Sequence, residues 1–339
     1  MKTESFNYHL PLSCIAQTPL ELRHNSRLLV YDRSSNAISD CIFKNIKYYL
    51  VPGDLLVINK TKVLPARIFG RKKTGGKVEI LLLKKKVDSS WEVLVGGKNI
   101  SEGKKILFED GLEAVVIKDL SRSKRILQFS RPIEPILEQI GEMPLPPYIH
   151  EKLLDQDRYQ TVYAQDEGSA AAPTAGLHFT DELMLDLKAY GVEFAEITLH
   201  VGLDTFAPVT EEEISDHIIH TEWCQISNHQ VRKINQARAE NRRVIAVGTT
   251  SVRTLETAER FKDEDGSLSA FSCPTDLFIT PGYEFHVVDA MVTNFHLPKS
   301  TLLMLVSSFA GLENIKRCYQ YAMREKYRFY SFGDSMLIV

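Results

Sequence analysis

Five short apolar segments follow one another in the first half of the chain at intervals of about ten residues. They cover residues 77–83, 91–95, 105–108, 112–117 and 125–129. Turn-forming sequences such as Gly-Gly, Glu-Asp-Gly and Ser-Arg-Ser separate them. Short strands at regular spacing, with a turn signal after each, are typical of a small all-β unit. We therefore predict a small β-sandwich or β-barrel in this region.

The residues on either side of this region have a different pattern. Before it, apolar runs at 27–31 and 54–58 indicate buried strands. After it, a helix beginning at Asp181 precedes a strand over 192–199, and an apolar strand over 243–247 leads directly into another helix. Strands that alternate with helices are typical of an α/β domain.

Two helices between these strands are predicted from capping residues. The sequence Thr-Glu-Glu-Glu at 210–213 matches a capping box and predicts a helix start. Ser227 is in a position to begin a further helix. The stiff, proline-rich segment 143–149 marks the exit from the β region.

The predicted fold class is α/β, with a discontinuous larger domain and a small inserted one. The α/β domain consists of residues 1–61 and 150–339, and residues 62–149 form the inserted β-barrel-like domain. A chain of 339 residues exceeds the usual size of one domain, which agrees with this division.

The cysteines and the apolar runs limit where such a protein can work. The five cysteines are scattered and never form a C-x-x-C pair, so a disulfide framework and a zinc knuckle are both unsupported. The N-terminus has no signal pattern, and the most apolar run, 301–311, is shorter than the roughly 18 residues of a membrane span. We expect a cytoplasmic monomer that makes no membrane contact.

The net charge of −3 hides an uneven distribution. Residues 62–125 contain sixteen basic and eight acidic residues, whereas the rest of the chain contains 25 basic and 36 acidic ones. Clustered lysines and arginines bind phosphates favourably because they release counterions. The inserted domain is therefore predicted to contact a polyanion, although a merely solubilising surface would have the same composition.

Residues 168–180 consist almost entirely of small side chains, in the order Gly-Ser-Ala-Ala-Ala-Pro-Thr-Ala-Gly-Leu-His-Phe-Thr. Glycines at 168 and 176 permit positive φ, and Pro173 fixes a turn. Thr180 can cap the helix that follows, whose free N–H groups would then point towards the loop. The segment predicts a shaped binding loop that presents His178; the alternative is a turn that only allows close packing.

A second candidate site is the strand-to-helix turn at 248–251, Gly-Thr-Thr-Ser. Backbone N–H groups and hydroxyls at a helix N-terminus suit a phosphate or a carboxylate, and Arg253 could hold an anion through two hydrogen bonds. The turn matches neither common nucleotide-binding motif. A plain capping turn and an ordinary salt bridge remain equally good explanations.

Four histidines lie near predicted turns, namely His178, His200, His220 and His296. Imidazole is the usual proton-transfer group near neutral pH, although any single histidine is more often structural. His217 and His220 could share a helix face, but no third ligand is suitably spaced, so no metal site is predicted. The sequence also lacks a Gly-x-Ser-x-Gly elbow, which excludes the common serine hydrolase arrangement.

Taken in order, blocks of sequence resemble a known family over almost the whole chain. They lie at 54–59, 63–67, 159–163, 168–180, 197–202, 220–223, 247–253, 294–300 and 327–334. Together they resemble the S-adenosylmethionine:tRNA ribosyltransferase-isomerases of queuosine synthesis. The chain departs from that family's pattern at Lys60 and Lys62, and at Leu203, Asp204 and Ala207, so no role is given to these five positions.

The resemblance implies a specific reaction. The ribosyl moiety of S-adenosylmethionine would be transferred and isomerised onto 7-aminomethyl-7-deazaguanine in the tRNA anticodon wobble position, giving epoxyqueuosine-tRNA, adenine and methionine. A base would remove a proton beside the sulfonium, adenine would leave, and the exocyclic amine would attack as methionine departs. The partners implied are tRNA and S-adenosylmethionine, with no metal and no cofactor beyond the S-adenosylmethionine that is consumed.

Roles follow for individual residues under this resemblance. The proton-transfer candidates are His178 and His296. The predicted substrate-binding residues are Thr174, Gly176, Phe179, His200, Thr249, Thr250, Arg253 and Asn294. The predicted nucleic-acid-binding residues in the basic region are Arg67, Lys84, Lys85 and Lys86.

Two other classes of function are compatible with the sequence. A methyltransferase would use the same sulfonium donor, but the usual glycine-rich strand-turn is missing. A noncatalytic tRNA-binding protein would need only the basic region and not the small-residue loop.

Overall fold

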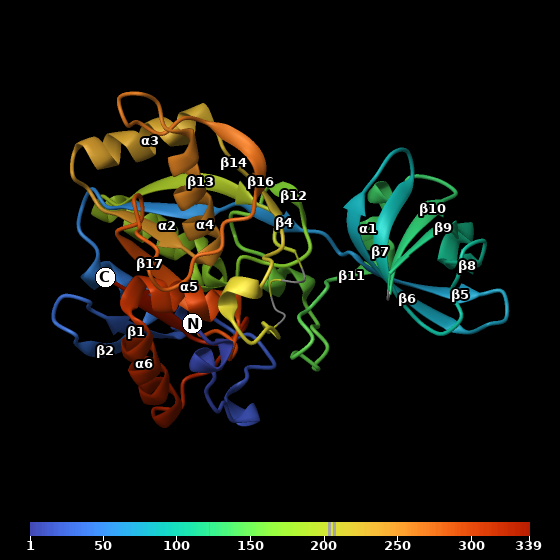
Figure 1. Cartoon of the computed structure of the whole chain (residues 1–339), viewed down its shortest axis with the longest axis horizontal. Helices are drawn as coiled ribbons and strands as arrows, with labels where there is room; N and C mark the ends of the chain where they lie inside the picture. The colour runs from blue at the N-terminus through green and yellow to red at the C-terminus, as the bar shows by residue number, and fades with distance from the viewer. Residues whose placement is uncertain (122, 203–204, 206–207) are drawn as a thin grey trace. The chain divides into compact units, whose positions relative to one another are not determined.

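In the computed structural model, residues 1–121, 123–202, 205 and 208–339 are described. They form two compact units (Figure 1). Unit 1 contains Met1–Lys62, Pro146–Asp166 and Ala172–Val339, and unit 2 contains Val63–Leu145 and Glu167–Ala171. The positions Leu203, Asp204 and Ala207 named above lie outside the described residues.

Unit 1 is built on a sheet that has nine strands among the described residues. The strands are β1 (Arg27–Tyr31), β2 (Ile38–Ile42), β3 (Leu55–Asn59), β13 (Glu193–Leu199), β14 (Glu222–Ile226), β15 (Val244–Val247), β16 (Phe271–Thr275), β17 (Ala290–Asn294) and β18 (Ser335–Ile338). Their order is β16-β14-β13-β3-β15-β17-β18-β1-β2, so strands from both ends of the chain, blue and red in Figure 1, share one sheet.

The four central strands, β13, β3, β15 and β17, run parallel to one another. Every residue of β3, β15 and β17 is buried, which explains why these segments are continuous apolar runs rather than alternating ones. Parallel strands place their carboxyl ends at the same edge of the sheet. Antiparallel β18 brings the residues before it to that edge as well, since Ser335 pairs with Asn294.

Helices cover both faces of this sheet. They are α2 (Asp181–Tyr190), α3 (Asn228–Ala239), α4 (Thr249–Ala258), α5 (Thr301–Ala310) and α6 (Leu312–Arg324). Leu183 and Leu187 of α2 and the 3-10 helix η4 (Phe43–Tyr49) pack on Leu56 and Ile58 of β3. Helix α4 packs against β3, β13 and β15 outside that cluster, on the opposite face.

The predicted helix at Asp181 is confirmed together with its ends. Thr180 Oγ1 accepts a hydrogen bond from the Leu183 N–H at 3.2 Å, as an N-cap residue does. Gly191 follows the helix at φ 101°, the left-handed conformation that commonly ends a helix.

The capping-box prediction at 210–213 is wrong, since only a short 3-10 turn, η10 (Ile214–Asp216), forms there. The backbone of this segment pairs with the N-terminus of the chain instead. The Thr3 N–H donates to Glu212 O at 2.9 Å, and the Ile214 N–H donates to Met1 O at 3.1 Å. Long-range pairing thus replaces the helix that the local sequence favours.

Unit 2 is a closed antiparallel barrel. Its elements are β5 (Arg67–Lys72), β6 (Lys77–Lys85), β7 (Ser90–Gly96), β8 (Lys105–Leu107), β9 (Glu113–Ser121), β10 (Lys124–Phe129), α1 (Leu137–Ile140) and β11 (Gly141–Glu142). The order β5-β6-β7-β10-β9-β8 closes because β8 also pairs with β5, and β11 adds to the outer edge of β5. The predicted class, α/β with an inserted barrel-like domain, is confirmed.

Closure of the barrel depends on a strand that the sequence did not reveal. Strand β5 contains three basic residues and one glycine among six positions, and only Ile68 and Gly70 are buried. A Cβ on Gly70 would lie 2.6 Å from Ile106 Cγ2 of β8, so glycine is needed where these two strands meet. The connecting segments β4 (Thr61–Val63) and β12 (Asp166–Ser169) form a separate two-stranded sheet.

Among the described residues, no helix has both the length and the apolar character needed to span a membrane. All five cysteines are free thiols.

Because β3 lies at the centre of the sheet, we expect truncation of a buried side chain in this strand to lower the stability of the protein. Leu56→Ala should lower the free energy of unfolding by about 2–5 kcal/mol, because the side chain is fully buried and its removal leaves a cavity. Urea unfolding would measure this cost. Leu185→Ala, on the exposed face of α2 with 66% exposure, is the matched control and should change stability by no more than about 0.5 kcal/mol.

Candidate active site

A pocket of about 610 Å³, part of it open to solvent, lies at the carboxyl edge of the parallel strands of unit 1. Its walls come from the segments that follow β13, β15 and β17, from the small-residue loop and from the residues before β18. In open α/β sheets this edge is where ligands bind. The polar side chains that line it are Tyr148, Thr174, Thr205, Thr249, Thr250, Thr293, Asn294, His296, Ser300, Tyr330 and Ser331.

The small-residue loop forms one wall of the pocket through Ala172, Pro173, Thr174 and Ala175. Its 3-10 helix η8 (Thr174–His178) keeps these short side chains close to the cavity. Thr174 Oγ1 donates to Asn294 Oδ1 at 3.2 Å and so ties the loop to the end of β17. Thr174, which was predicted to bind substrate, therefore lies in the wall of the pocket.

Gly176 and Phe179 lie behind this wall rather than in it. A Cβ on Gly176 would lie 2.1 Å from Tyr163 Oη, so glycine is required there for close packing and not for positive φ. Gly168 is the glycine of the loop that has a positive φ, at 140°. Phe179 is fully buried in the core between α2 and the sheet.

Thr249 and Thr250 line the pocket from the first turn of α4. Gly248, at φ 90°, turns the chain from β15 into this helix. Thr250 Oγ1 is buried and has no hydrogen-bond partner among the described residues. A buried hydroxyl without a partner is costly, so this atom and the free N–H groups of the first turn provide donors for a ligand.

Asn294 connects the pocket to His178. Its amide nitrogen lies 3.2 Å from Tyr330 O and 3.2 Å from His178 Nε2. Because a backbone carbonyl can only accept, the amide group must point its NH₂ this way and donate to the ring as well. The ring proton of His178 then sits on Nδ1 and is donated to Ser26 Oγ at 2.7 Å.

Both ring nitrogens of His178 are thus engaged within the protein. The side chain is buried and lines a second pocket together with Arg23 and Arg328. Burial, together with the smaller effects of the charges of Arg328 and Arg23, lowers the pKa of His178 to about 3. The imidazole is therefore neutral at physiological pH.

His296 lines the main pocket directly. Its Nε2 lies 2.8 Å from Thr293 Oγ1, and its Nδ1 has no hydrogen bond to a described residue. Its backbone is held from both sides, because its N–H donates to Tyr319 Oη at 2.9 Å and its carbonyl accepts from Tyr8 Oη at 2.5 Å. Burial alone lowers the pKa of His296 to about 3, so this ring is also neutral.

Aromatic rings and neutral polar groups give the pocket its electrostatic character. None of its described lining side chains is an acid, a lysine or an arginine. The rings of Tyr148 and Tyr330 have their centroids 4.7 Å apart, and Tyr330 has a φ of 70°, a strained value for a tyrosine. Ring faces attract cations, so this pocket suits a cationic organic ligand better than a strongly anionic one.

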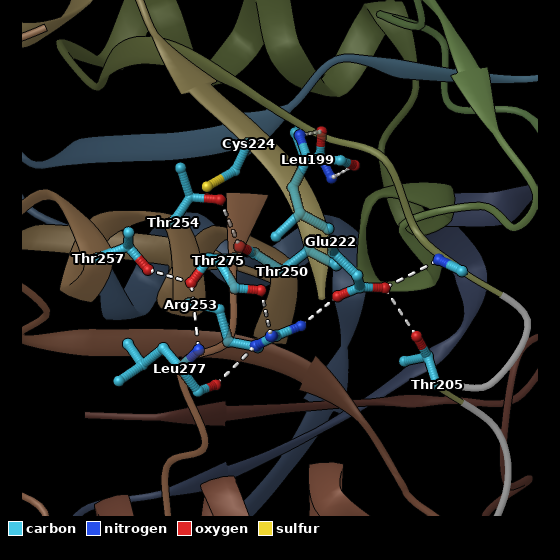
Figure 2. A network of polar contacts seen from close by, with 12 residues as sticks. Leu199, Thr205, Glu222, Cys224, Thr250, Arg253, Thr254, Thr257, Thr275 and Leu277 are labelled. Atoms are coloured by element: carbon cyan, nitrogen blue, oxygen red, sulfur yellow. Dashed lines mark hydrogen bonds and ion pairs between the residues drawn. The ribbon is translucent and has the colours of Figure 1, made fainter. Parts of the chain in front are cut away.

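Arg253 lies outside the main pocket, in a buried network shown in Figure 2. Its guanidinium forms an ion pair with Glu222 and donates to Leu277 O at 3.0 Å. Glu222 Oε1 also accepts from the Gly202 N–H and from Thr205 Oγ1, each at 2.8 Å. The network therefore joins α4, β14 and the Thr205 segment of the pocket wall.

His200 is likewise outside the pocket lining. Its ring stacks on Trp223 with 5.1 Å between centroids, and its Nδ1 lies 2.8 Å from Thr61 Oγ1. Burial lowers the pKa of His200, an effect that Asp166 partly opposes.

His217 and His220 do not share a helix, because the chain leaves η10 at His217. His217 Nδ1 pairs with Glu211 Oε2 at 2.9 Å. No group of three or more potential metal ligands is found in the described part of the chain.

The predicted nucleic-acid-binding residues all lie in unit 2. Lys84, Lys85 and Lys86 are exposed around the end of β6, where Lys85 pairs with Glu134 and Lys86 pairs with Glu92. Arg67 on β5 lies 3.3 Å from Glu79. Their role in binding RNA stays a prediction.

Sequence reasoning missed the two tyrosines of the pocket. Tyr148 lies in the proline-rich segment that was read only as a domain exit, and Tyr330 lies in the 327–334 block, where no residue was given a role. The available signal for Tyr330 was the aromatic segment 327–332, which lies shortly before the apolar C-terminal residues.

Comparison with known proteins gives the family. The family model for "Queuosine biosynthesis protein" matches residues 3–338. The chain is 54% identical to the S-adenosylmethionine:tRNA ribosyltransferase-isomerase of Carboxydothermus hydrogenoformans and 53% identical to that of Caldanaerobacter subterraneus, over the full length of each. The chain belongs to the queuosine biosynthesis family of ribosyltransferase-isomerases.

A solved structure supports the same assignment. The crystal structure of an S-adenosylmethionine tRNA ribosyltransferase from Thermotoga maritima is 39% identical, covers 99% of this chain and 100% of its own, and superposes with a TM-score of 0.58. The resemblance predicted from the sequence blocks is confirmed. As a family member, the chain is a transferase-isomerase enzyme that acts in tRNA modification.

The buried ion pair predicts a coupled effect on stability. Arg253→Met should lower the free energy of unfolding by about 3–5 kcal/mol, because it leaves the Glu222 carboxylate buried without its cation. Adding Glu222→Gln to Arg253→Met should cost less than Glu222→Gln costs alone, with a coupling of about 1–3 kcal/mol in urea unfolding. Strictly additive costs would show that the pair does not act as a unit.

The two neutral histidines predict a loss of stability in mild acid. Their folded-state pKa of about 3 lies below the unfolded value of about 6.5, so the unfolded chain binds more protons between these values. The stabilisation is complete above pH 6.5 and falls as the pH decreases. Urea unfolding at pH 7.5 and pH 5 should differ by roughly 2 kcal/mol for each histidine.

His178→Gln tests this origin, because glutamine keeps a donor and an acceptor but does not titrate. The variant should lose about half of the pH dependence attributed to the pair. An unchanged dependence would assign the acid sensitivity to other groups.

Proposed function

We propose that this enzyme transfers and isomerises the ribosyl moiety of S-adenosylmethionine onto 7-aminomethyl-7-deazaguanine in the anticodon wobble position of tRNA. The products are epoxyqueuosine-tRNA, adenine and methionine. The observation that carries the proposal is the pocket at the carboxyl edge of β15 and β17, which combines tyrosine rings, unpaired donors and a neutral imidazole. The full-length relatives carry the name of the same enzyme.

The first argument concerns the charge of the donor. S-adenosylmethionine carries a sulfonium, and the described pocket lining contains no lysine or arginine that would repel it. The rings of Tyr148 and Tyr330 offer faces for a cation–π contact. His296 adds no positive charge, because burial keeps it neutral.

The second argument concerns the polar groups of the donor. Thr250 Oγ1 and the N–H groups at the start of α4 need acceptors, and the hydroxyls and carboxylate of S-adenosylmethionine supply them. Thr174 Oγ1 donates to Asn294 Oδ1, and this bond fixes the orientation of the Asn294 amide in the pocket wall. Binding of these groups fixes the ribose relative to His296.

The third argument concerns proton transfer. We assign it to His296, because this ring lines the pocket and its Nδ1 is not engaged by a described residue. The proton on the carbon beside the sulfonium is acidified by the positive sulfur, so a neutral imidazole can accept it. The glycosidic bond to adenine then breaks and adenine takes up a proton. The amine of the aminomethyl group bonds to the ribosyl fragment and loses a proton. An oxygen of that fragment displaces methionine at the carbon–sulfur bond and so closes the epoxide.

His178 has a different role in this scheme. Its two ring nitrogens hold Ser26 and Asn294, so it positions the amide that faces the pocket. Arg67, Lys84, Lys85 and Lys86 of the barrel are assigned to tRNA binding, for which the basic charge of residues 62–125 is the support.

Product analysis tests the function itself. The enzyme, S-adenosylmethionine and an anticodon stem-loop carrying 7-aminomethyl-7-deazaguanine should yield adenine, methionine and epoxyqueuosine-RNA. Formation of S-adenosylhomocysteine instead would identify a methyltransferase. RNA binding without any consumption of S-adenosylmethionine would favour a noncatalytic binding protein.

Replacement of the two histidines should separate their roles. His296→Gln is expected to lower the rate of adenine release in single turnover by about 10²-fold or more, because it removes the proton acceptor. The reduction expected for His178→Gln is smaller, because glutamine can still hold Ser26 and Asn294. The reverse order of effects would move the proton-transfer role to His178.

A further inference from the structure

Three arginines line a second pocket in unit 1, separate from the main one. They are Arg23 of the 3-10 helix η3 (Arg23–Asn25), Arg158 of the 3-10 helix η7 (Gln156–Tyr159) and Arg328, which follows α6. The pocket measures about 310 Å³, including its open part. Three segments far apart in the sequence thus bring like charges to one place.

Acidic side chains do not balance these charges directly. No aspartate or glutamate is among the described residues that line the pocket, and each hydrogen bond found for the three guanidinium groups within the described part of the chain goes to a backbone carbonyl. Carboxylates outside the pocket act on these groups only through space: Asp155, Asp157 and Asp181 on Arg23, and Asp334 on Arg328. Burial lowers the pKa of Arg23, and the charge of Arg158 lowers it further.

The hydrogen bonds of the arginines leave much of their donor capacity unused. Arg23 donates to Gln160 O at 2.6 Å and to Asp157 O at 2.7 Å. Arg158 donates to Leu20 O, and Arg328 donates to Phe332 O. All four acceptors are neutral carbonyls, which orient the guanidinium groups without neutralising them.

Two of the remaining donors are buried and unpaired. The Nε atoms of Arg158 and Arg328 are inaccessible to solvent and have no partner among the described residues. A guanidinium has five N–H donors in a planar fork, which matches the oxygens of a phosphate or a carboxylate. Guanidinium groups that converge repel one another, and their unpaired buried donors lower the stability of the free protein. A bound oxyanion would offset the positive charge and accept hydrogen bonds from these donors.

The second pocket adjoins the main one. Ser331 lines both, and His178 of the second pocket is bonded to Asn294 of the main pocket. A molecule bound in the main pocket is therefore close enough to extend a group to the arginines.

We propose that Arg23, Arg158 and Arg328 bind a backbone phosphate of the RNA next to the nucleotide that is modified. The inference rests on the proposed function, since it takes the RNA as the molecule that enters the main pocket. Phosphate is favoured over the carboxylate of S-adenosylmethionine because three convergent guanidinium groups offer more charge and more donors than one carboxylate needs. None of these three residues was assigned a role from the sequence.

The first test uses inorganic phosphate and the whole enzyme. Phosphate should raise the melting temperature of the wild type more than chloride does at equal ionic strength. Arg158→Gln and Arg328→Gln should abolish this difference. Arg33→Gln is the matched control and should keep it, because Arg33 also lies in unit 1 and donates to the carbonyls of Asp289 and Val339 but does not line the pocket.

The second test uses the anticodon stem-loop RNA. Loss of one charged contact should weaken RNA binding by about tenfold in Arg158→Gln and Arg328→Gln. The slope of log affinity against log salt should decrease in magnitude by about 0.7, the value for one phosphate of a single strand. Arg328→Lys keeps the charge and should retain part of the affinity, and the melts of the first test show whether each variant is folded.

Two further outcomes would overturn the proposal, and a third would overturn the proposed reaction alone. If RNA affinity is unchanged while KM for S-adenosylmethionine rises, and decarboxylated S-adenosylmethionine shows no such rise, the arginines bind the donor carboxylate. If neither ligand is affected and phosphate does not stabilise the wild type, the arginines are structural. If RNA and phosphate behave as expected but no adenine is released, the anion site stands and the proposed reaction fails.

Discussion

The parallel pairing of β13, β3, β15 and β17 is the constraint on which the site of this enzyme depends. It brings the carboxyl ends of three strands, at 199–202, 247–250 and 294–296, to one edge of the sheet. More than forty residues separate each of these segments from the next in the sequence. Continuous burial of β3 and β15 fixes that register from both faces. Antiparallel β18 then brings Tyr330 and Ser331 to the same edge.

The elements that could be predicted from the sequence are those whose signal is local. Buried strands β3 and β15, helix α2 with its Thr180 cap and the spacing of β6 to β10 all follow from nearby residues. The elements that were missed depend on distant partners. Strand β5 carries too many charges to show alternation. At the helix expected from 210–213, one backbone carbonyl and one backbone N–H are bonded to the N-terminus instead. Local capping cannot reveal a competing segment that lies two hundred residues away.

The candidate site divides in the same way. The sequence identified Thr174, Thr249, Thr250, Asn294 and His296, each of which lines the pocket, because small or polar residues beside strand ends are a local signal. Arg253, Phe179 and His200 carry the same signal but lie outside it. Arg253 forms an ion pair with Glu222, Phe179 packs in the hydrophobic core, and His200 stacks on a tryptophan. Only the three-dimensional neighbours decide whether such a side chain faces a ligand or another part of the protein.

Two pockets of opposite electrostatic character meet at Asn294 and His178. The main pocket has no charged side chain in its described lining, whereas three arginines line the second. Asn294 and the neutral His178 form the link between the two pockets. A protonated His178 would add a fourth positive charge to those of the three arginines, next to the main pocket. Such a separation suits the proposed reaction, which joins a cationic sulfonium donor to a polyanionic acceptor. The cation requires aromatic and neutral polar surroundings, and the phosphates require unpaired guanidinium donors nearby.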